Sequence, residues 1–309
     1  MFRYILRRSL FLIPVMLGVS FIVFSLIHFT PGDPAMVILG ESAPPEAIEQ
    51  LRTEMGLDDP FLVQYGRYVF NVVTKLDFGR SYVSRREVFG EIIGQFPNTV
   101  KLAGLAVTVA MLIGIPAGVI AATHQNKWID NVTMFFSLLG VSMPIFWQGI
   151  LLILVFSLTL QWLPSSGFNT WQQMILPSLT LGSGSAAIIA RMTRSSMLEV
   201  YRQDYVRTAR SKGLKERVVV TRHALKNALI PIVTVIGLQF GFLLGGAVLT
   251  ESIFGIPGLG RLMVNSIRTK DMMIIQGGVL LIAFTFSIIN LFVDVLYAYL
   301  DPRIRSQYK

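Results

Sequence analysis

The sequence predicts an all-α, polytopic membrane protein with six transmembrane helices. Of its 309 residues, 53% are hydrophobic and only 15% are charged, whereas soluble domains contain about 25% charged residues. Five stretches without Asp, Glu, Lys or Arg are each long enough for a helix to cross the hydrocarbon layer, which takes about 20 residues. The chain also contains no cysteine, so disulfides and thiolate metal sites are excluded.

The five uncharged stretches give the spans in order. They cover residues 9–32, 102–126, 131–190, 227–250 and 272–293. The third is long enough for two helices, and its middle, QWLPSSGFNTWQQ, contains turn residues with Trp162 and Trp171 placed as interfacial anchors. The first follows several arginines, as in a signal peptide, but it is long and lacks a small-x-small cleavage site. We therefore interpret it as an uncleaved first span.

The distribution of basic residues predicts the orientation. An even number of spans places both termini on one side, together with residues 191–226, which hold ten Lys/Arg and three acids. The turn between Trp162 and Trp171 has no basic residue. By the positive-inside rule, the shared side is cytoplasmic. We expect a multi-pass protein of the cytoplasmic (inner) membrane with both termini in the cytoplasm.

These spans divide the chain into four regions. Residues 1–30 form the first helix, 31–98 an extracytoplasmic segment, 99–300 a core of five helices, and 301–309 a cytoplasmic tail. The extracytoplasmic segment has a helical pattern at 44–55, followed by the aromatic residues Phe61, Tyr65, Tyr68 and Phe70. We expect a small cap of helices lying on the membrane, with its acids on a solvated face.

The chain lacks the sequence patterns of several enzymatic reactions. There is no G-x-x-x-x-G-K-[ST] phosphate loop and no H-E-x-x-H pair, so we expect no nucleotide hydrolysis, no catalytic residue, no metal site and no cofactor on this chain. Gly255, Gly258 and Gly260 in FGIPGLGR predict a tight extracytoplasmic turn. Ser183 and Ser185 could suggest an intramembrane protease, but no histidine lies in the last two spans to act as a base.

The spans contain almost no ionisable residue that could couple transport to an ion. Asp294, in the last helix, is the one candidate, and the helix length places it near the cytoplasmic interface. We interpret it as an interfacial or interhelical polar contact. The energy for any transport is then expected from outside this chain.

Glycines and prolines within the spans predict where helices pack closely and where they bend. Gly237, Gly241 and Gly245 lie at four-residue spacing on one face of the fifth span, next to Gly246. The face is interpreted either as static helix packing or as a pathway or subunit surface that slides. Pro116, Pro144 and Pro177 are expected to kink their helices, which would suit a pathway that opens alternately.

The basic segment contains a predicted helix that ends in a glycine turn. Asp204 is placed as an N-cap, DYVRTARSK continues as a helix, and Gly213 ends it before a second helix at 214–227. Such a helix would lie across the membrane face. It could bind anionic lipid, or it could dock against a soluble protein.

The spacing Ala209-x-x-x-Gly213 in DYVRTARSKGL resembles the EAA loop of ABC-transporter permeases. The resemblance covers essentially the whole chain and is closest to the B-type permease subunits of dipeptide and oligopeptide importers. Further segments that carry it are TPGDP (30–34), MGLDDP (55–60), LDFGRS (76–81), GVSMPIFW (140–147), RHALKNALIP (222–231), FGIPGLGRL (254–262) and NLFVDVLYAYLDPRIR (290–305).

The resemblance implies a type I ABC importer permease fold and a coupling loop at 199–228 that docks into an ATPase subunit. The coupling residues carried over are Asp204, Tyr205, Arg207, Thr208, Ala209, Lys212 and Gly213. The sequence departs from the general pattern at Arg207, where a Glu opens the EAA triplet, at Thr208, which replaces its first Ala, and at Pro231, which comes later than usual.

The resemblance also implies several partners for this chain. They are a homologous second permease, two ATPases that bind ATP and Mg²⁺, an extracytoplasmic substrate-binding protein and the lipid bilayer, without nucleic acid. Di- or oligopeptides are the expected cargo, and glutathione or a nickel chelate is the alternative. A stand-alone secondary transporter or channel is a more distant alternative.

Overall fold

The computed structural model describes the backbone of residues 2–40 and 42–300, and the side chains of residues 6–40 and 42–296. The predicted tail at 301–309 lies outside this range. The described chain is helical, with one isolated β-bridge between Arg80 and Glu87. The long elements are α1 (Phe2–His28), α5 (Val88–Thr123), α6 (Trp128–Ser142), α8 (Trp171–Tyr201), α11 (Lys226–Ile253) and α13 (Met272–Leu300).

Five of the described helices are long and apolar enough to cross a membrane, and the number is six if a bent pair of helices is counted as one span. The helix that contains α5 begins at Val88, ahead of the apolar stretch expected from residue 102, because a helix can continue into water beyond the bilayer. Similarly, the helix that contains α11 begins at Glu216 and passes through a short α10 (Glu216–Val218) and a π-helical turn, η2 (Val219–Leu225).

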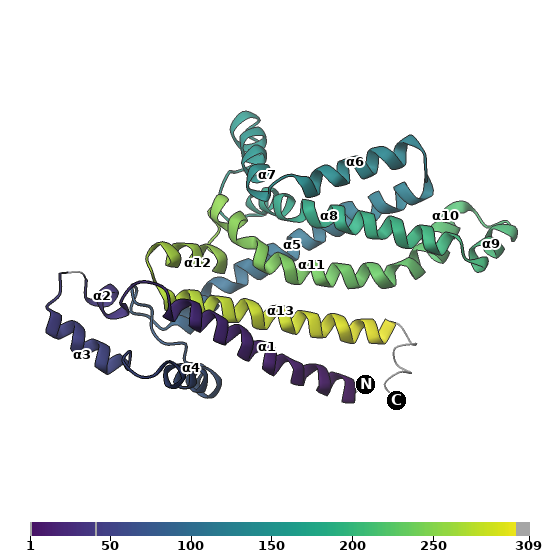
Figure 1. Cartoon of the computed structure of the whole chain (residues 1–309). Coiled ribbons are helices and arrows are strands. Elements are labelled where there is room, and N and C mark those ends of the chain that lie inside the picture. Colours follow the sequence, from purple (N-terminus) through teal and green to yellow (C-terminus); the bar gives the residue numbers. More distant parts are fainter. Residues whose placement is uncertain (1, 41, 301–309) are drawn as a thin grey trace.

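The bent span contains one of the predicted kinks. α6 and the segment formed by α7 (Ile145–Leu152) and η1 (Ile153–Thr159) meet at an angle of 104°. Pro144 stands at the break, where it has no N–H to continue the α6 hydrogen bonds. α7 therefore turns away from the bundle (Figure 1). Pro116 and Pro177, in contrast, lie inside helices that continue past them.

The core lies between α5, α8 and α11. Small residues bring α5 and α8 into close contact: a Cβ added at Gly114 or Gly118 would lie 2.5 Å from the carbonyl oxygen of Ala186 or Ala190. The fully buried side chains of Leu102, Leu176 and Leu244 fill the space between the three helices and belong to one apolar cluster.

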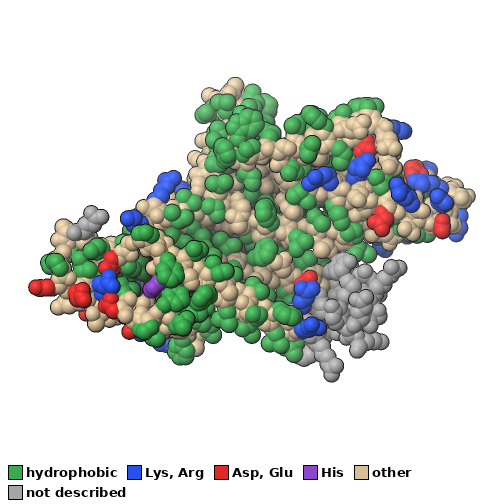
Figure 2. Space-filling view, viewed as in Figure 1, with side chains coloured by type: hydrophobic (Ala, Val, Ile, Leu, Met, Phe, Trp, Pro, Cys, Tyr) green, Lys and Arg blue, Asp and Glu red, His purple; other side chains and the backbone are tan. Residues whose placement is uncertain are grey.

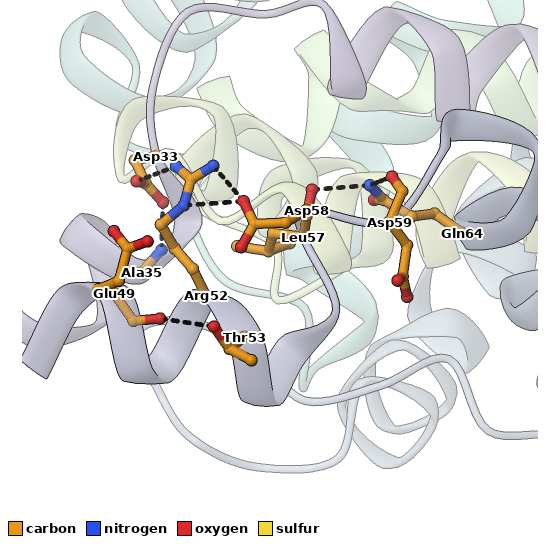
Figure 3. A network of polar contacts seen from close by, with 9 residues as sticks. All are labelled: Asp33, Ala35, Glu49, Arg52, Thr53, Leu57, Asp58, Asp59 and Gln64. Carbon is orange, nitrogen blue, oxygen red and sulfur yellow. Dashed lines mark hydrogen bonds and ion pairs between the residues drawn. The ribbon is translucent and has the colours of Figure 1, made fainter.

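A cap of three short helices follows α1. They are α2 (Pro34–Leu39), α3 (Pro45–Met55) and α4 (Phe61–Lys75), so the helix expected at 44–55 is confirmed. Figure 3 shows the polar network of the cap, in which Arg52 of α3 donates to Asp33 and to Asp58, at 2.7 Å in each case. These hydrogen bonds raise the pKa of Arg52 above its ordinary value.

The cap is also fixed to the first span. Tyr65 of α4 donates to the Leu17 carbonyl at 3.1 Å and lies 2.9 Å from the Ser20 hydroxyl. Its ring and that of Phe61 lie against Phe24 of α1. The aromatic residues that the sequence placed in this segment therefore hold α4 against α1, except Phe70, which is exposed.

The bundle has two different ends. The start of α1, the end of α13 and the short helix α9 (Asp204–Ser211) lie at one end, which we call the α9 end (Figure 1). The cap and α12 (Leu259–Arg268) lie at the other, the α12 end. Lys and Arg side chains gather over α9 and α10, and acidic side chains gather over α3 (Figure 2).

Candidate functional site

The short helix α9 presents one apolar face to the bundle. Val206 and Ala209, one turn apart, are buried together with Val219 and pack against Val200 and Tyr201. The N-cap prediction for Asp204 is wrong by one residue: Gln203 holds that position, and Asp204 lies in the first turn, with its carbonyl accepting from Thr208. Its carboxylate faces water rather than capping the helix.

Gly213 makes the turn that ends the helix. Its φ is +77°, a left-handed conformation that side chains disfavour. Its N–H donates to the Arg210 carbonyl at 2.9 Å. An added Cβ would meet no atom within 4 Å, so the requirement for glycine comes from the backbone conformation and not from crowding.

Arg210 connects both sides of the turn. It donates to the two carboxylate oxygens of Glu216, at 2.7 and 3.1 Å, and this pairing raises the pKa of Arg210 above its ordinary value. Its guanidinium also lies over the Tyr201 ring, 5.2 Å from the centroid. The side chain thus links α9 to the end of α8 and to the start of the next long helix.

A second hydrogen bond holds α9 to the base of α11. Asn227 donates from Nδ2 to the Tyr205 hydroxyl at 2.9 Å. Together with the apolar contacts and Arg210, it fixes α9 to two membrane-spanning helices. A force applied to α9 would therefore reach α8 and α11 directly.

The outer face of the site is polar and exposed. It contains the remaining predicted residues, Asp204, Arg207, Thr208, Lys212 and Gly213. Asp204 and Arg207 lie 4.0 Å apart with side chains 98% and 74% exposed, so their pairing contributes little. The structure therefore brings the predicted residues together but divides them: Ala209 faces the bundle, Tyr205 bonds to α11, and the others face outward.

The predicted glycine face of α11 also divides into two parts. Cβ atoms added at Gly237 and Gly241 would collide with Val293 and Phe286 of α13, so these two glycines allow close helix packing. Gly245 has open space beside it and lines, with Gly246, an apolar groove of about 560 Å³ between α11 and α13.

Sequence reasoning missed several buried polar groups, among them two acids. Glu251, fully buried at the end of α11, accepts from the Thr99 hydroxyl at 2.6 Å and from the Arg261 N–H at 2.9 Å. Asp130, at the start of α6, accepts two hydrogen bonds of 2.7 Å from Arg194 of α8. Both acids stand directly beside uncharged stretches of the sequence. That position was the sequence feature that could have indicated their burial.

The remaining residues singled out from the sequence have structural roles. Asp294 pairs with Arg8 of α1 at 2.8 Å, which confirms an interhelical contact. Gly255 has φ +64° in the turn before α12, and Gly258 and Gly260 approach the Glu251 carboxyl closely. Within residues 2–40 and 42–300, no group of three or more His, Asp or Glu could hold a metal ion.

Comparison with known proteins identifies the family. A sequence model described as "Binding-protein-dependent transport system inner membrane component" matches residues 114–306, and the model of the N-terminal part of such membrane components matches residues 1–103. The chain belongs to this family. The family assignment confirms the resemblance to ABC-transporter permeases that the coupling-loop spacing indicated.

Two similar proteins are permeases of a glutathione and of a dipeptide transport system. The glutathione transport system permease protein GsiC of Escherichia coli (strain K12) is 48% identical over 305 residues, covering 99% of each chain. The dipeptide transport system permease protein DppB of Alkalihalophilus pseudofirmus is 45% identical over 333 residues, covering 99% of this chain and all of that one.

Solved structures support the fold of this family member. An inward-facing structure of the MetNI methionine ABC transporter aligns with a TM-score of 0.59 at 17% identity, covering 69% of this chain and 97% of that one. An amino acid ABC transporter with histidines aligns with a TM-score of 0.50 at 20% identity, covering 69% and 94%. The predicted all-α, ABC-permease type of fold is thereby confirmed.

Proposed function

We propose that this chain is the permease subunit of an ATP-driven, binding-protein-dependent importer and forms half of a pathway for di- or oligopeptides. The observation that carries the proposal is α9, which offers an exposed polar face on a helix fixed to α8 and α11. The family supplies the setting, because its members work with a separate binding protein. The α9 end is cytoplasmic by the positive-inside rule, and the α12 end is extracytoplasmic.

In this proposal, two ATPase subunits bind ATP and Mg²⁺, and one of them docks on the outer face of α9. A homologous permease completes the pathway. Movement of the ATPases pushes α9, and the Arg210–Glu216 and Tyr205–Asn227 contacts pass the motion to α8 and α11. Such a transmission moves whole helices as rigid bodies. The chain itself carries out no hydrolysis.

The turn at Gly213 provides the sharpest test of the coupling role. Gly213→Val places a β-branched side chain at φ +77° and costs about 1–2 kcal/mol of backbone strain, so α9 should lose its orientation. Gly213→Asn is the matched control, because asparagine tolerates this conformation. We expect the valine variant to insert normally, retain ATP hydrolysis in the assembled complex and lose peptide uptake in proteoliposomes. Normal uptake by Gly213→Val would contradict the role of α9.

The cargo is di- or oligopeptides, and glutathione is the second candidate because GsiC is 48% identical to this chain and DppB 45%. A titration of the purified binding protein with a dipeptide, a pentapeptide, glutathione and a nickel chelate separates these. Tight binding of a dipeptide or pentapeptide supports the proposal. Binding of glutathione alone or of the nickel chelate alone would replace the cargo but leave the permease role unchanged.

A further inference from the structure

The loop between α4 and α5 is held rigidly at the α12 end. Ser81 donates to Asp271, which immediately precedes α13, and the Tyr82 N–H donates to the same carboxylate at 3.2 Å. Ser81 and Asp271 are 2% and 3% exposed. The Ser81 N–H also donates to the Arg86 carbonyl at 2.9 Å. The base of the loop is therefore fixed by buried hydrogen bonds.

This rigid loop displays three exposed arginines, Arg80, Arg85 and Arg86, around a cavity of about 810 Å³. Arg85 donates to the Ile38 carbonyl at 2.5 Å. The side chains of Arg80 and Arg86 have no hydrogen bond or ion pair with any residue that the structure describes. The backbone that carries these two guanidinium groups is thus fixed, and their donors are unused.

Neither acid beside the arginines forms an ion pair with Arg80 or Arg86 among the described residues. Glu91 accepts from the Ser84 hydroxyl, and Glu87 is exposed at the start of α5. Guanidinium groups bind carboxylates by paired, charge-assisted hydrogen bonds. The preferred ligand of Arg80 and Arg86 is therefore a carboxylate from outside the chain.

The shape of the cavity favours a protein ligand over a free peptide. Small-molecule sites enclose about 70–90% of their ligand with mostly apolar walls. Here the walls are three arginines, two glutamates, Ser84, Gln95 and two glycines, with Leu262 of α12 as the one apolar side chain. Such a charged surface suits acidic side chains that project from a large partner better than it suits a small molecule that needs apolar walls.

We propose that Arg80 and Arg86 form a docking site for an acidic surface of the soluble binding protein. The inference rests on the proposed function, because it places that partner at the extracytoplasmic end. Charge pairs at the rim of an interface act mainly on the association rate and weaken with salt. The site would thus guide the loaded binding protein onto the permease.

The test measures the affinity of the purified, dipeptide-loaded binding protein for the whole transporter in nanodiscs, at low and at high salt. For Arg80→Gln with Arg86→Gln, we expect affinity to fall about tenfold at low salt, mainly in the association rate, and the difference to shrink at high salt. The control is Lys75→Gln with Arg268→Gln, which removes the same charge from exposed residues of the same end outside the cavity. The control should stay within about twofold of wild type.

An unchanged affinity in the arginine variant, or an equal loss in the control, would overturn the docking site. The same holds if binding-protein affinity is normal while the variant loses direct binding of the free dipeptide, since the cavity would then belong to the substrate. Thermal unfolding of the variant checks that it is folded. A wild-type complex that does not bind the binding protein at all contradicts the proposed function itself, and the two failures are thereby distinguished.

Discussion

Two sets of charged groups, one at each end of the bundle, are satisfied in opposite ways. At the α12 end, Glu251 is fully buried and Asp271 is 3% exposed, and each accepts hydrogen bonds from within the chain. On the outer face of α9, the side chains of Asp204 and Arg207 are 98% and 74% exposed. The two buried acids are satisfied within the chain, whereas these two exposed groups are available to a partner.

The difference has an energetic consequence. A buried carboxylate is tolerated only when hydrogen bonds replace the water it has lost, so its partners become essential to the fold. An exposed charge contributes little to folding, because water screens it. Substitutions of the buried acids Glu251 and Asp271 should therefore change stability, and substitutions on the outer face of α9 should change binding.

The largest effect is expected at Glu251. Glu251→Ala leaves the Thr99 hydroxyl and the Arg261 N–H without their acceptor and opens a cavity. We expect a loss of about 3 kcal/mol of unfolding free energy, with a smaller loss for Glu251→Gln, which keeps an acceptor. Thermal unfolding of the purified permease in detergent measures the loss of stability in each variant. Glu54→Ala, an exposed acid of α3, is the control and should change stability by less than about 0.5 kcal/mol. Equal stability of the two alanine variants would remove the contrast.

A smaller effect is expected beneath α9. Val206 is fully buried in a small cluster with Ala209 and Val219. Val206→Ala removes two methyl groups and should weaken the attachment of α9 by about 1.5 kcal/mol. Hydrogen exchange should then accelerate in the amides of α9 while the amides of α5 and α8 remain protected. Ser211→Ala, on the exposed side of the same helix, should leave the exchange unchanged. Uniform acceleration throughout the bundle would show that α9 is not an independent unit.

The helices and the coupling turn could be predicted from the sequence because their determinants are local. An uncharged stretch as long as the bilayer is thick predicts a membrane span, and a glycine after a polar helix predicts a left-handed turn. Gly213 confirms this: its φ is positive and its surroundings are empty, so the local backbone alone requires glycine.

The buried polar contacts could not be predicted because their partners are far apart in the chain. Glu251 meets Thr99, and Ser81 meets Asp271, 190 positions away. No periodicity in the sequence indicates such a pairing. The 104° bend at Pro144 was predicted only as a kink, since proline removes one hydrogen bond but the packing around it sets the angle.

The smallest change in stability is expected on the outer face of α9, and there it should accompany a large change in binding. Arg207→Gln with Lys212→Gln removes two exposed charges that hold nothing in the bundle. Unfolding free energy should change by less than about 0.5 kcal/mol, while the ATPase subunits bind the permease about tenfold more weakly, mainly through slower association. Stability is measured by thermal unfolding, and ATPase affinity by titration of purified subunits.

The control for this pair is Lys75→Gln with Arg268→Gln, which removes the same net charge at the opposite end of the bundle. If both pairs weaken ATPase binding equally, overall charge and not the position of α9 governs association. If Arg207→Gln with Lys212→Gln instead destabilises the permease by more than about 1 kcal/mol, the outer face of α9 belongs to the fold. The exposed charges of α9 would then no longer differ in kind from the buried acids of the α12 end, because a charge exposed to water would be contributing what only buried groups are expected to contribute.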